Sequence, residues 1–438
     1  MKTELENVSS IKRKLKVEVP APEVGQAYQE SVSKIQKKAK IKGFREGKVP
    51  PAVVEKQFAA EIQQEAMERV VQKSYPKALE ELKVFPVSQP RVIPGTFSKE
   101  KEFSYTAEFE IRPEIVVKNY KGLKLEREKV DVDPKMVEGE LTRLQQQMTQ
   151  LEPTPEETLS AKGHVLTVDF SGVAEGQKFE GSESKDFALE LGAKGLLPDF
   201  ENGLIGLKKG EKKNLKFDYP KDYFNKALAG KKAEFNVTVK DIRKKNVPVL
   251  NDDFAKDLGQ YKTLVEVKAD IQKRIADHLE NDSKGKLFRK ILEELSKSNP
   301  FEVPESMVLS ELNNMIETLA RDLSSQGKKL DDLNVQELYQ QHQPEAEFRV
   351  RSFLLLDKIS ELESVLISEE EVDQFIATQA ASLKRPAEEV KAYYIKNRLL
   401  DSLKLRLLHE KTLEFVLNQA KIKETNPKKE ANPSKKGG

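Results

Sequence analysis

The chain alternates between stretches with an apolar period of two and stretches with helical spacing, and their order predicts its organisation. Residues 10–19 place apolar side chains at every second position and residues 103–111 repeat this period, so two strands are expected. Between them, residues 24–35 and 54–62 carry apolar stripes at helical spacing. Residues 1–115 are therefore expected to form an α+β domain in which a basic loop joins two helices.

The character of the sequence changes again in the later segments. Residues 116–152 contain a long polar helical stretch over residues 135–151, which predicts a helical connecting arm. Alternating apolar positions then predict a small β-rich domain over residues 153–245. Residues 246–423 have helical periodicity, and the final mixture of Lys, Glu, Asn and Pro predicts a disordered tail over residues 424–438.

Prolines are expected to divide the helical region into several helices. They are Pro300, Pro304, Pro344 and Pro386. A coiled coil is the alternative, but these prolines prevent the unbroken heptads that it needs. The pattern leaves open whether the helices close into a self-satisfied bundle or form arms that enclose a groove.

Composition narrows the class of protein. A chain of 438 residues is long enough for about three domains. Hydrophobic residues make up 37% and charged residues 34%, with a mean hydropathy of -0.62, which favours long charged helices. Lys and Arg number 75 against 73 Asp and Glu, so any contact with RNA must come from a local patch rather than from net charge.

Several chemistries and locations are excluded or disfavoured by what the sequence lacks. There is no cysteine, which excludes thiolate nucleophiles, cysteine metal sites and disulfides. The first four residues lack the apolar core of a signal peptide, and no segment approaches about 18 uninterrupted apolar residues. A cytoplasmic protein without a membrane span is expected.

A short basic loop is the most informative motif. Glycines permit positive φ at both ends and a proline stiffens the exit, so the aromatic side chain and the arginine between them are expected to point outward. The loop consists of Gly43, Phe44, Arg45, Glu46, Gly47, Lys48, Val49 and Pro50. Cations crowd around it at Lys34, Lys37, Lys38, Lys40, Lys42, Arg45 and Lys48. The alternatives are a simple helix connection with its aromatic tucked into the core, and a solvated helix face.

The string GFRxGKxP resembles the ribosome-docking signature of the trigger factor family, bacterial chaperones that act at the exit of the nascent-chain tunnel. The resemblance implies that residues 43–50 bind the ribosome near the tunnel exit, through ribosomal protein and rRNA. Residues 301–308 resemble a segment of the C-terminal domain of the same family. They imply a helical body with dispersed apolar patches that binds unfolded nascent polypeptides weakly and releases them without ATP.

The middle domain carries a set of apolar residues that on its own suggests only a core. The strings VDFSG, GQKFEG and LLPDFENGL occur in the order found in FKBP-type peptidyl-prolyl isomerases, so residues 160–245 resemble that fold. The resemblance implies that the pocket is lined by Phe170, Phe179, Leu196, Leu197, Phe200, Tyr223 and Phe235. Phe200 replaces the Trp and Glu180 replaces the Asp of many drug-binding members. Tight macrolide binding is therefore in doubt.

The reaction implied by this resemblance needs no nucleophile, because the X-Pro bond is rotated over a barrier of about 18–20 kcal/mol and never cleaved. An apolar pocket favours the less polar twisted amide over the planar one. Tyr223 is expected to donate a hydrogen bond to the peptide. Asp169 and Glu180 resemble a general acid/base pair, but two carboxylates near a hairpin are expected to be structural.

No cofactor or metal is expected. The histidines His164, His278, His342 and His409 lack metal-ligand spacing and are expected to be satisfied or solvated. No phosphate-binding loop is present, because Gly210-Glu211-Lys212 lacks the glycine pattern and the following Ser or Thr.

The combined expectation is an α+β multidomain protein: an α+β ribosome-docking head, a small β-rich FKBP-like domain and an all-α C-terminal chaperone domain. In the competing hypothesis, a stand-alone prolyl isomerase or interaction protein uses its helical region only for dimerisation, and its basic loop binds another acidic partner. The family resemblance is also compatible with a homodimer of the free protein.

Overall fold

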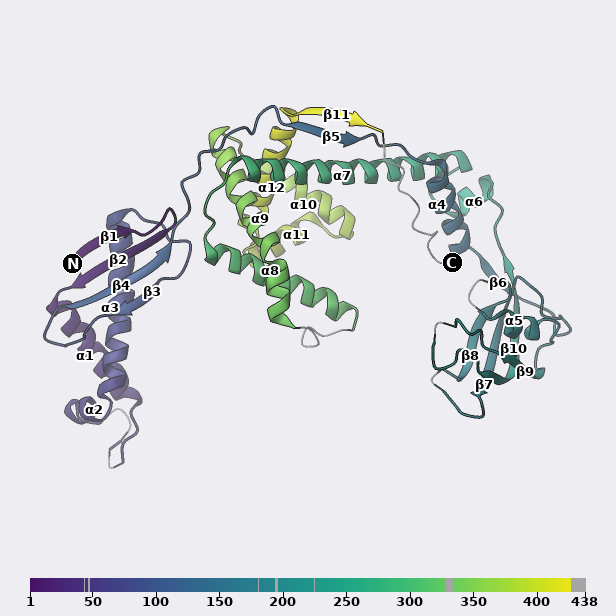
Figure 1. The fold of residues 1–438 in the computed structure, drawn as a ribbon, viewed down its shortest axis with the longest axis horizontal. Coiled ribbons are helices and arrows are strands. Elements are labelled where there is room, and N and C mark those ends of the chain that lie inside the picture. The colour runs from purple at the N-terminus through teal and green to yellow at the C-terminus, as the bar shows by residue number, and fades with distance from the viewer. Residues whose placement is uncertain are drawn as a thin grey trace. The chain divides into compact units, whose positions relative to one another are not determined.

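The protein divides into two compact units, each with its own hydrophobic clusters. Figure 1 labels the helices and strands of both units. One unit combines Met1–Glu128 with Ser283–Gly438, and the other is Lys129–Asp282. The computed structural model describes residues 1–42, 44–45, 48–179, 181–193, 196–223, 225–327 and 334–426. Mixed sheets and helices, a β-rich middle region and a helical C-terminal region confirm the predicted α+β multidomain class.

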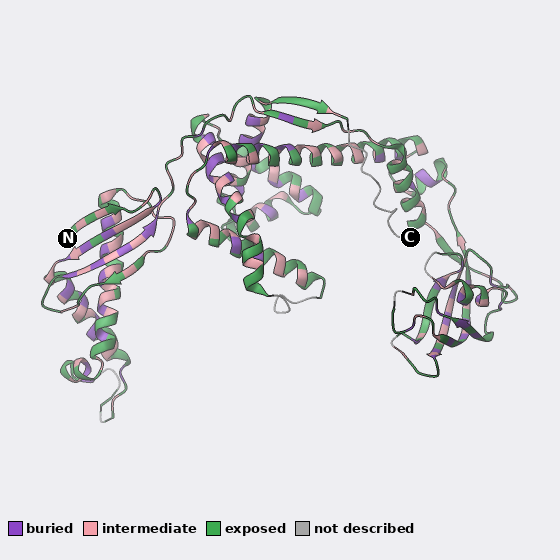
Figure 2. Cartoon of the chain, viewed as in Figure 1, coloured by how far each residue is buried: buried purple, intermediate pink, exposed green. Residues whose placement is uncertain are grey.

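The N-terminal part of the first unit, residues 1–111 (the head), is built on an antiparallel sheet. Its strand order is β1 (Lys2–Asn7), β2 (Lys12–Val19), β4 (Phe103–Glu110) and β3 (Arg91–Pro94). The predicted alternation holds in β2 and β4, where Leu15 pairs with Ala107 and Val17 with Tyr105, all four buried. Figure 2 colours the whole chain by burial. Strands β1 and β3 were not predicted.

Helices α1 (Ala21–Lys38) and α3 (Ala59–Leu82) bury their apolar faces in the same cluster as β2 and β4. The stripe at residues 54–62 was expected to form one helix. It is split at Phe58, whose backbone leaves the helical region between α2 (Pro51–Gln57) and α3. The hydroxyls of Ser74 in α3 and Tyr105 in β4 lie 2.8 Å apart, so the buried polar atoms between helix and sheet satisfy each other.

The second unit contains a five-stranded sheet around one short helix. The path is β6 (Gln150–Pro153), β10 (Lys232–Asn246), β7 (His164–Ala174) and β8 (Glu183–Glu190), with β9 (Lys212–Asp218) also pairing with β10. Helix α5 (Pro198–Leu204) buries Phe200 and Leu204 in the same cluster as the sheet. The helix expected over residues 135–151 ends early, because α4 (Pro134–Gln147) stops before β6, in which Leu151 pairs with Lys245.

The start of the helical region belongs to this second unit, which differs from the expected boundary at residue 246. Helices α6 (Asp252–Asp257) and α7 (Leu264–Ser298) contribute Ala255, Val267 and Ile271 to a cluster with Leu141 of α4. Helix α7 is 35 residues long and continues past Asp282 into the first unit. Packing against α4, rather than helical periodicity, therefore decides where the unit ends.

The remaining helices bury their side chains in separate clusters. They are α8 (Glu305–Ser325), α9 (Val335–Leu362), α10 (Glu369–Leu383), α11 (Ala387–Lys396) and α12 (Leu400–Asn418). One cluster joins α7, α9 and α12, and another joins α10, α11 and α12. Among the described residues, this separation favours arms over a single closed bundle.

Pro344 does not divide the helical region as expected, because it lies inside α9. A proline inside a helix costs about 3 kcal/mol. The residues that follow it in α9, including Ala346, Val350 and Leu354, are buried, and this burial offsets the cost. The predicted breaks at Pro300, Pro304 and Pro386 are confirmed, since each lies between two helices.

The end of the described chain forms a strand, which corrects part of the predicted disordered tail. Strand β11 (Lys421–Thr425) pairs in parallel with β5 (Lys124–Glu128), with Ile422 opposite Leu125. Leu125 is buried in the cluster shared by α7, α9 and α12. Residues 424 and 425 are therefore ordered by pairing, while residues 427–438 lie outside the described residues.

A carboxylate at the end of β4 caps a helix of the body. The N-terminus of α8 has no side-chain cap of its own, since Pro304 occupies that position. The Glu110 carboxylate accepts hydrogen bonds from the backbone N–H groups of Glu305 at 3.2 Å and Ser306 at 2.9 Å. The Ser306 hydroxyl donates to the same carboxylate at 2.5 Å. The head thus supplies acceptors that this helix terminus lacks.

Candidate functional sites

The basic loop between α1 and α2 is anchored at both ends by buried residues. Val49 is 1% exposed and packs with Val32, Val54 and Ile62, and the half-buried Ile41 packs against the same cluster. The Gln36 side-chain amide donates a hydrogen bond to the Val49 carbonyl at 2.6 Å. These anchors fix where the loop leaves and rejoins the helices.

Between the anchors, the described side chains point into solvent. Phe44 is 44% exposed, Arg45 and Lys48 are exposed as well, and so is Pro50 just after the second anchor. Backbone hydrogen bonds from Phe44 to Ile41 at 3.1 Å and from Lys48 to Arg45 at 2.9 Å tighten the turn. Gly43, Glu46 and Gly47 lie outside the described residues, and the predicted positive φ of the two glycines therefore stays a prediction.

Val49 stands apart from the other members of the predicted docking motif. Its side chain is buried, so it anchors the loop and does not offer a contact surface. The expectation that the aromatic side chain points outward instead of into the local core agrees with the exposure of Phe44.

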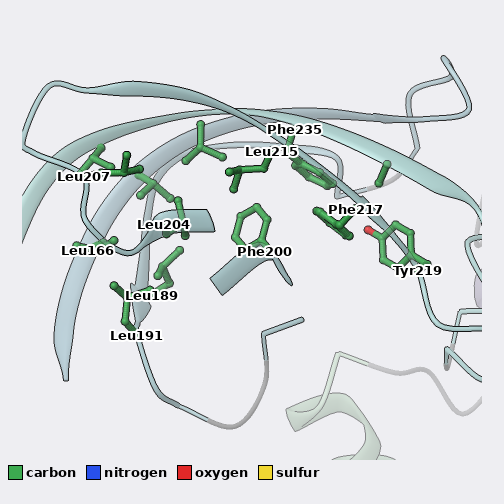
Figure 3. Packing of buried hydrophobic residues seen from close by; sticks show 14 of the residues in the cluster. Leu166, Leu189, Leu191, Phe200, Leu204, Leu207, Leu215, Phe217, Tyr219 and Phe235 are labelled. Carbon is green, nitrogen blue, oxygen red and sulfur yellow. The ribbon is translucent and has the colours of Figure 1, made fainter. Parts of the chain in front are cut away.

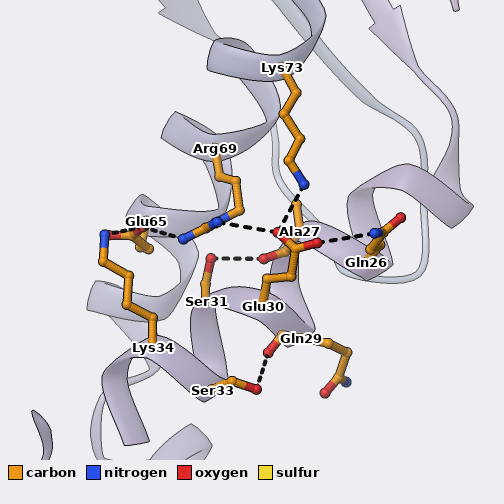
Figure 4. A network of polar contacts seen from close by, with 10 residues as sticks. All are labelled: Gln26, Ala27, Gln29, Glu30, Ser31, Ser33, Lys34, Glu65, Arg69 and Lys73. Atoms are coloured by element: carbon orange, nitrogen blue, oxygen red, sulfur yellow. Dashed lines mark hydrogen bonds and ion pairs between the residues drawn. The ribbon is translucent and has the colours of Figure 1, made fainter. Parts of the chain in front are cut away.

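A charged network ties the two helices that carry the loop (Figure 4). Arg69 of α3 bonds to Glu30 at 3.2 Å and to Glu65 at 3.1 Å, and Lys73 bonds to Glu30 at 2.9 Å. Lys34 bonds to Glu65 at 2.6 Å, and this hydrogen bond lowers the pKa of the Glu65 carboxyl. Lys34 is therefore engaged in support of the helices, whereas Lys37, Lys38 and Lys42 remain exposed near the loop.

The second unit gathers all the predicted pocket residues into one cluster. Phe200 and Phe235 are buried in it (Figure 3), and the other members are half-buried and pack against them. Those other members are Phe170, Phe179, Leu196, Leu197 and Tyr223. Half-burial leaves part of each of these five side chains accessible beside the two buried rings.

Phe235 of β10 is the centre of the aromatic arrangement. Its ring centroid lies 5.9 Å from that of Phe170, 6.2 Å from Phe179 and 5.6 Å from Phe200. The rings of Phe179 and Phe200 are turned roughly edge-on to it, with interplanar angles of 74° and 76°. Such edge-to-face contacts fix ring orientation and leave an apolar surface.

The sequence prediction missed two aromatic members of this cluster. Phe217 stacks on Phe235 with centroids 5.7 Å apart and an interplanar angle of 12°. Tyr219, just after β9, lies 4.7 Å from the ring of Tyr223 and 6.5 Å from that of Phe179. The alternation of Leu215, Phe217 and Tyr219 along one strand face was the available signal.

The carboxylates near the pocket have structural partners where they are described. Asp169 accepts a hydrogen bond from the backbone N–H of Asp186 at 2.8 Å, and this bond together with Lys240 lowers the pKa of the Asp169 carboxyl. Asp186 lies within β8 with a φ of 53°, where the register with β7 shifts, so the bond supports a left-handed residue in a bulge of this strand. Glu180 lies outside the described residues. Phe187 is 43% exposed and contacts the edge of Phe170.

The described residues show no grouping of His, Asp and Glu suited to a metal ion. His409 bonds through Nε2 to Asp357 at 2.8 Å, as expected of a satisfied histidine. Within the described ranges, none of the helices combines the length and the apolar character needed to cross a bilayer.

Known proteins are similar to this chain over almost its whole length. The model of the bacterial trigger factor protein matches residues 1–144, the model of its C-terminus matches residues 263–418, and that of FKBP-type peptidyl-prolyl cis-trans isomerase matches residues 156–240. The trigger factor of Geotalea daltonii is 34% identical over 98% of this chain and 99% of its own length. That of Geobacter sp. strain M21 is 35% identical over 98% of this chain and 100% of its own length.

A solved structure has a similar fold. It is reported as "Promiscuous Substrate Recognition in Folding and Assembly Activities of the Trigger Factor Chaperone", and the alignment covers 95% of this chain and 99% of that chain. The TM-score is 0.53 and the sequence identity is 18%, so this likeness concerns the fold alone.

Proposed function

This chain belongs to the trigger factor family, and from that premise we propose that it is an ATP-independent chaperone that docks on the ribosome, shields emerging polypeptides and isomerises X-Pro bonds. Docking is assigned to residues 43–50, shielding to the helical body, and isomerisation to the aromatic pocket of the second unit. The partners are ribosomal protein and rRNA near the tunnel exit, and unfolded nascent chains.

The geometry of the loop is the observation that carries the docking proposal. Phe44, Arg45 and Lys48 are exposed between the buried anchors Ile41 and Val49, on helices tied together by the Arg69 network. A rigid base keeps an exposed aromatic and two cations in a fixed arrangement, which lowers the entropy lost on binding. The cations suit phosphate and carboxylate groups, so binding should weaken as salt rises.

The test is binding to purified ribosomes across a salt titration. Replacing Phe44, Arg45 and Lys48 together with alanine is expected to abolish a saturable, salt-sensitive affinity. The matched control replaces Phe85, Arg91 and Lys101, which are also one exposed aromatic and two exposed cations of the head, and should bind as wild type. Unchanged binding by the loop variant would refute the assignment of residues 43–50.

The isomerase proposal rests on the aromatic pocket. Rotation about an X-Pro bond reduces amide resonance, and the twisted amide is less polar than the planar one. A surface of Phe170, Phe179 and Phe200 around Phe235 favours the twisted form, and each ~1.4 kcal/mol of such preference accelerates rotation about tenfold. Tyr223 packs against the same cluster, and we assign to it the hydrogen bond donated to the peptide.

The chaperone proposal is supported by apolar side chains that the helical arms leave uncovered. They include Leu309, Leu362, Leu366, Leu383, Tyr393 and Ile395. Scattered apolar contacts of this kind bind many sequences weakly, because no single pocket selects one side chain. Release then needs no nucleotide. Suppression of aggregation of an unfolded protein in the absence of ATP is the direct measurement.

A further inference from the structure

A second phenol besides Tyr223 belongs to the aromatic cluster of the second unit. Tyr219 is 7% exposed, and its ring centroid lies 5.5 Å from Phe217, 6.5 Å from Phe179 and 4.7 Å from Tyr223. Contacts with predicted pocket residues on two sides place this phenol in the wall itself. It lies beside Tyr223, the expected donor to the peptide.

The hydroxyl of Tyr219 has no protein partner among the residues that the structure describes. Buried tyrosine hydroxyls normally find a partner, as Tyr105 does with Ser74. The Tyr75 hydroxyl also lacks a partner, but its oxygen is buried from solvent. The Tyr219 oxygen, by contrast, keeps some exposure to solvent. Figure 3 shows this oxygen on the side of the ring that faces Phe217. The hydroxyl is therefore a donor without a partner, and its oxygen is not completely enclosed by protein.

We propose that the Tyr219 hydroxyl donates a hydrogen bond to a backbone carbonyl of the X-Pro segment held in the pocket, beside the bond donated by Tyr223. A peptide around proline offers carbonyl acceptors, while proline itself contributes no N–H donor. Burial, and to a lesser degree the neighbouring Tyr223, raises the pKa of Tyr219, so the phenol keeps its proton and acts as a donor at neutral pH. This assignment deepens the proposed isomerase function and rests on it.

The first experiment is isomerisation of a short prolyl peptide by the full-length Tyr219→Phe variant. The change removes the hydroxyl and keeps the ring, so the wall stays packed. Loss of one neutral hydrogen bond is expected to lower kcat/KM about fivefold to tenfold. The control is Tyr75→Phe, which removes an unpartnered buried hydroxyl from the head and should leave kcat/KM unchanged. Thermal unfolding of both variants checks that the fold is retained.

A second measurement identifies the acceptor. Each carbonyl of the peptide is replaced in turn by a thiocarbonyl, a weaker acceptor, and assayed with wild type and Tyr219→Phe. At the carbonyl bound by Tyr219, the two changes should be non-additive, because both remove the same bond. Equal kcat/KM for wild type and Tyr219→Phe, or additive effects at every carbonyl, would overturn this assignment alone. A wild-type protein without isomerase activity would instead overturn the proposed function.

Discussion

At the scale of single residues, Asp357 of α9 shows how one side chain links distant parts of a unit. Its carboxylate accepts from Arg112, just after β4, and contacts His409 of α12, both at 2.8 Å. Burial alone would raise the pKa of Asp357, but the hydrogen bonds and charges of His409 and Arg112 lower it below its ordinary value. The ionised carboxylate is therefore the form that the folded unit prefers.

The Asp357 site predicts a specific loss of stability in acid. A carboxyl with a depressed folded pKa stabilises the fold above its unfolded pKa of about 3.9, and this contribution disappears as the pH falls through the folded value. Asp357→Asn should lower the urea midpoint of the first unit at pH 7, and the difference from wild type should shrink below about pH 4. Equal differences at both pH values would show that charge is not the cause.

The pocket predicts a second effect at this scale. Phe200→Ala removes the ring that contacts both Phe217 and Phe235, so isomerase activity on a prolyl peptide should fall by about tenfold or more. A core truncation of this kind also costs about 3–5 kcal/mol of stability. Circular dichroism must therefore confirm the fold, and Phe200→Leu, which keeps more of the volume, should show the same loss of activity with less destabilisation.

Residue types and order were enough to predict most, but not all, of the side chains that gather in the aromatic cluster of the second unit. Phe170 and Phe200 were predicted from the strings that contain them and Phe235 from the resemblance of residues 160–245 to the isomerase fold, and the three meet in one cluster. Tyr219 was missed because it lies just beyond the end of its strand. Alternation predicts which face of a strand a side chain occupies, but it does not predict which rings a side chain beyond the strand end contacts. The pairing of Arg112 with Asp357 was unpredictable, since 245 residues separate them.

At the scale of elements, the ends of helices and strands depend on partners from elsewhere in the chain. Helix α8 begins where Glu110 of β4 supplies the missing acceptors. Local sequence predicted a break near Pro304, but it contained no sign of a cap from the head. Pro344 shows the reverse case. The local sequence predicted that the helix would end at this proline, but burial of the residues that follow it maintains α9 as one helix.

The Glu110 cap predicts a local change. Glu110→Ala leaves the N–H groups of Glu305 and Ser306 without acceptors, which should weaken the first turn of α8 by about 1–2 kcal/mol. Hydrogen exchange at these amides should then be about fivefold to thirtyfold faster. Glu108→Ala removes a carboxylate from the same strand that makes only an exposed ion pair with Lys14 at 4.0 Å, and should leave exchange in α8 unchanged.

Strand β11 predicts a difference between two truncations. Ending the chain after Ala420 removes the partner of β5 beside the buried Leu125, and the first unit should lose about 0.5–3 kcal/mol of stability. Ending it after Asn426 keeps every β11 pairing and should have no such effect. Equal unfolding midpoints for the two truncated proteins would show that β11 contributes nothing to stability.

At the scale of the whole molecule, the two proposed sites lie in different units. The loop and its anchors belong to the first unit, and the aromatic pocket belongs to the second. The sequence predicted this order of parts, because each part has its own periodicity. It did not predict that α7 begins in one unit and ends in the other, since an unbroken helical pattern carries no mark of where its packing partners change.

Separate units predict separable activities. The triple alanine variant of Phe44, Arg45 and Lys48 should lose ribosome binding and keep full isomerase activity on a short peptide. Phe200→Ala should show the opposite pattern, with ribosome binding and aggregation suppression retained. Parallel loss of both activities in either folded variant would contradict this separation.

The long-range pairing of the first unit also bears on how the protein is made. Val117 and Leu125 belong to a cluster that also contains residues of α7, α9 and α12, and this cluster is complete only when Leu413 and Val416, near the end of the chain, have been synthesised. The head sheet, by contrast, closes within residues 2–110 and can form early in synthesis. Every unfinished copy therefore exposes apolar segments for most of its translation. Under the proposed function, an unfinished copy of this protein is itself the kind of chain that finished copies would shield.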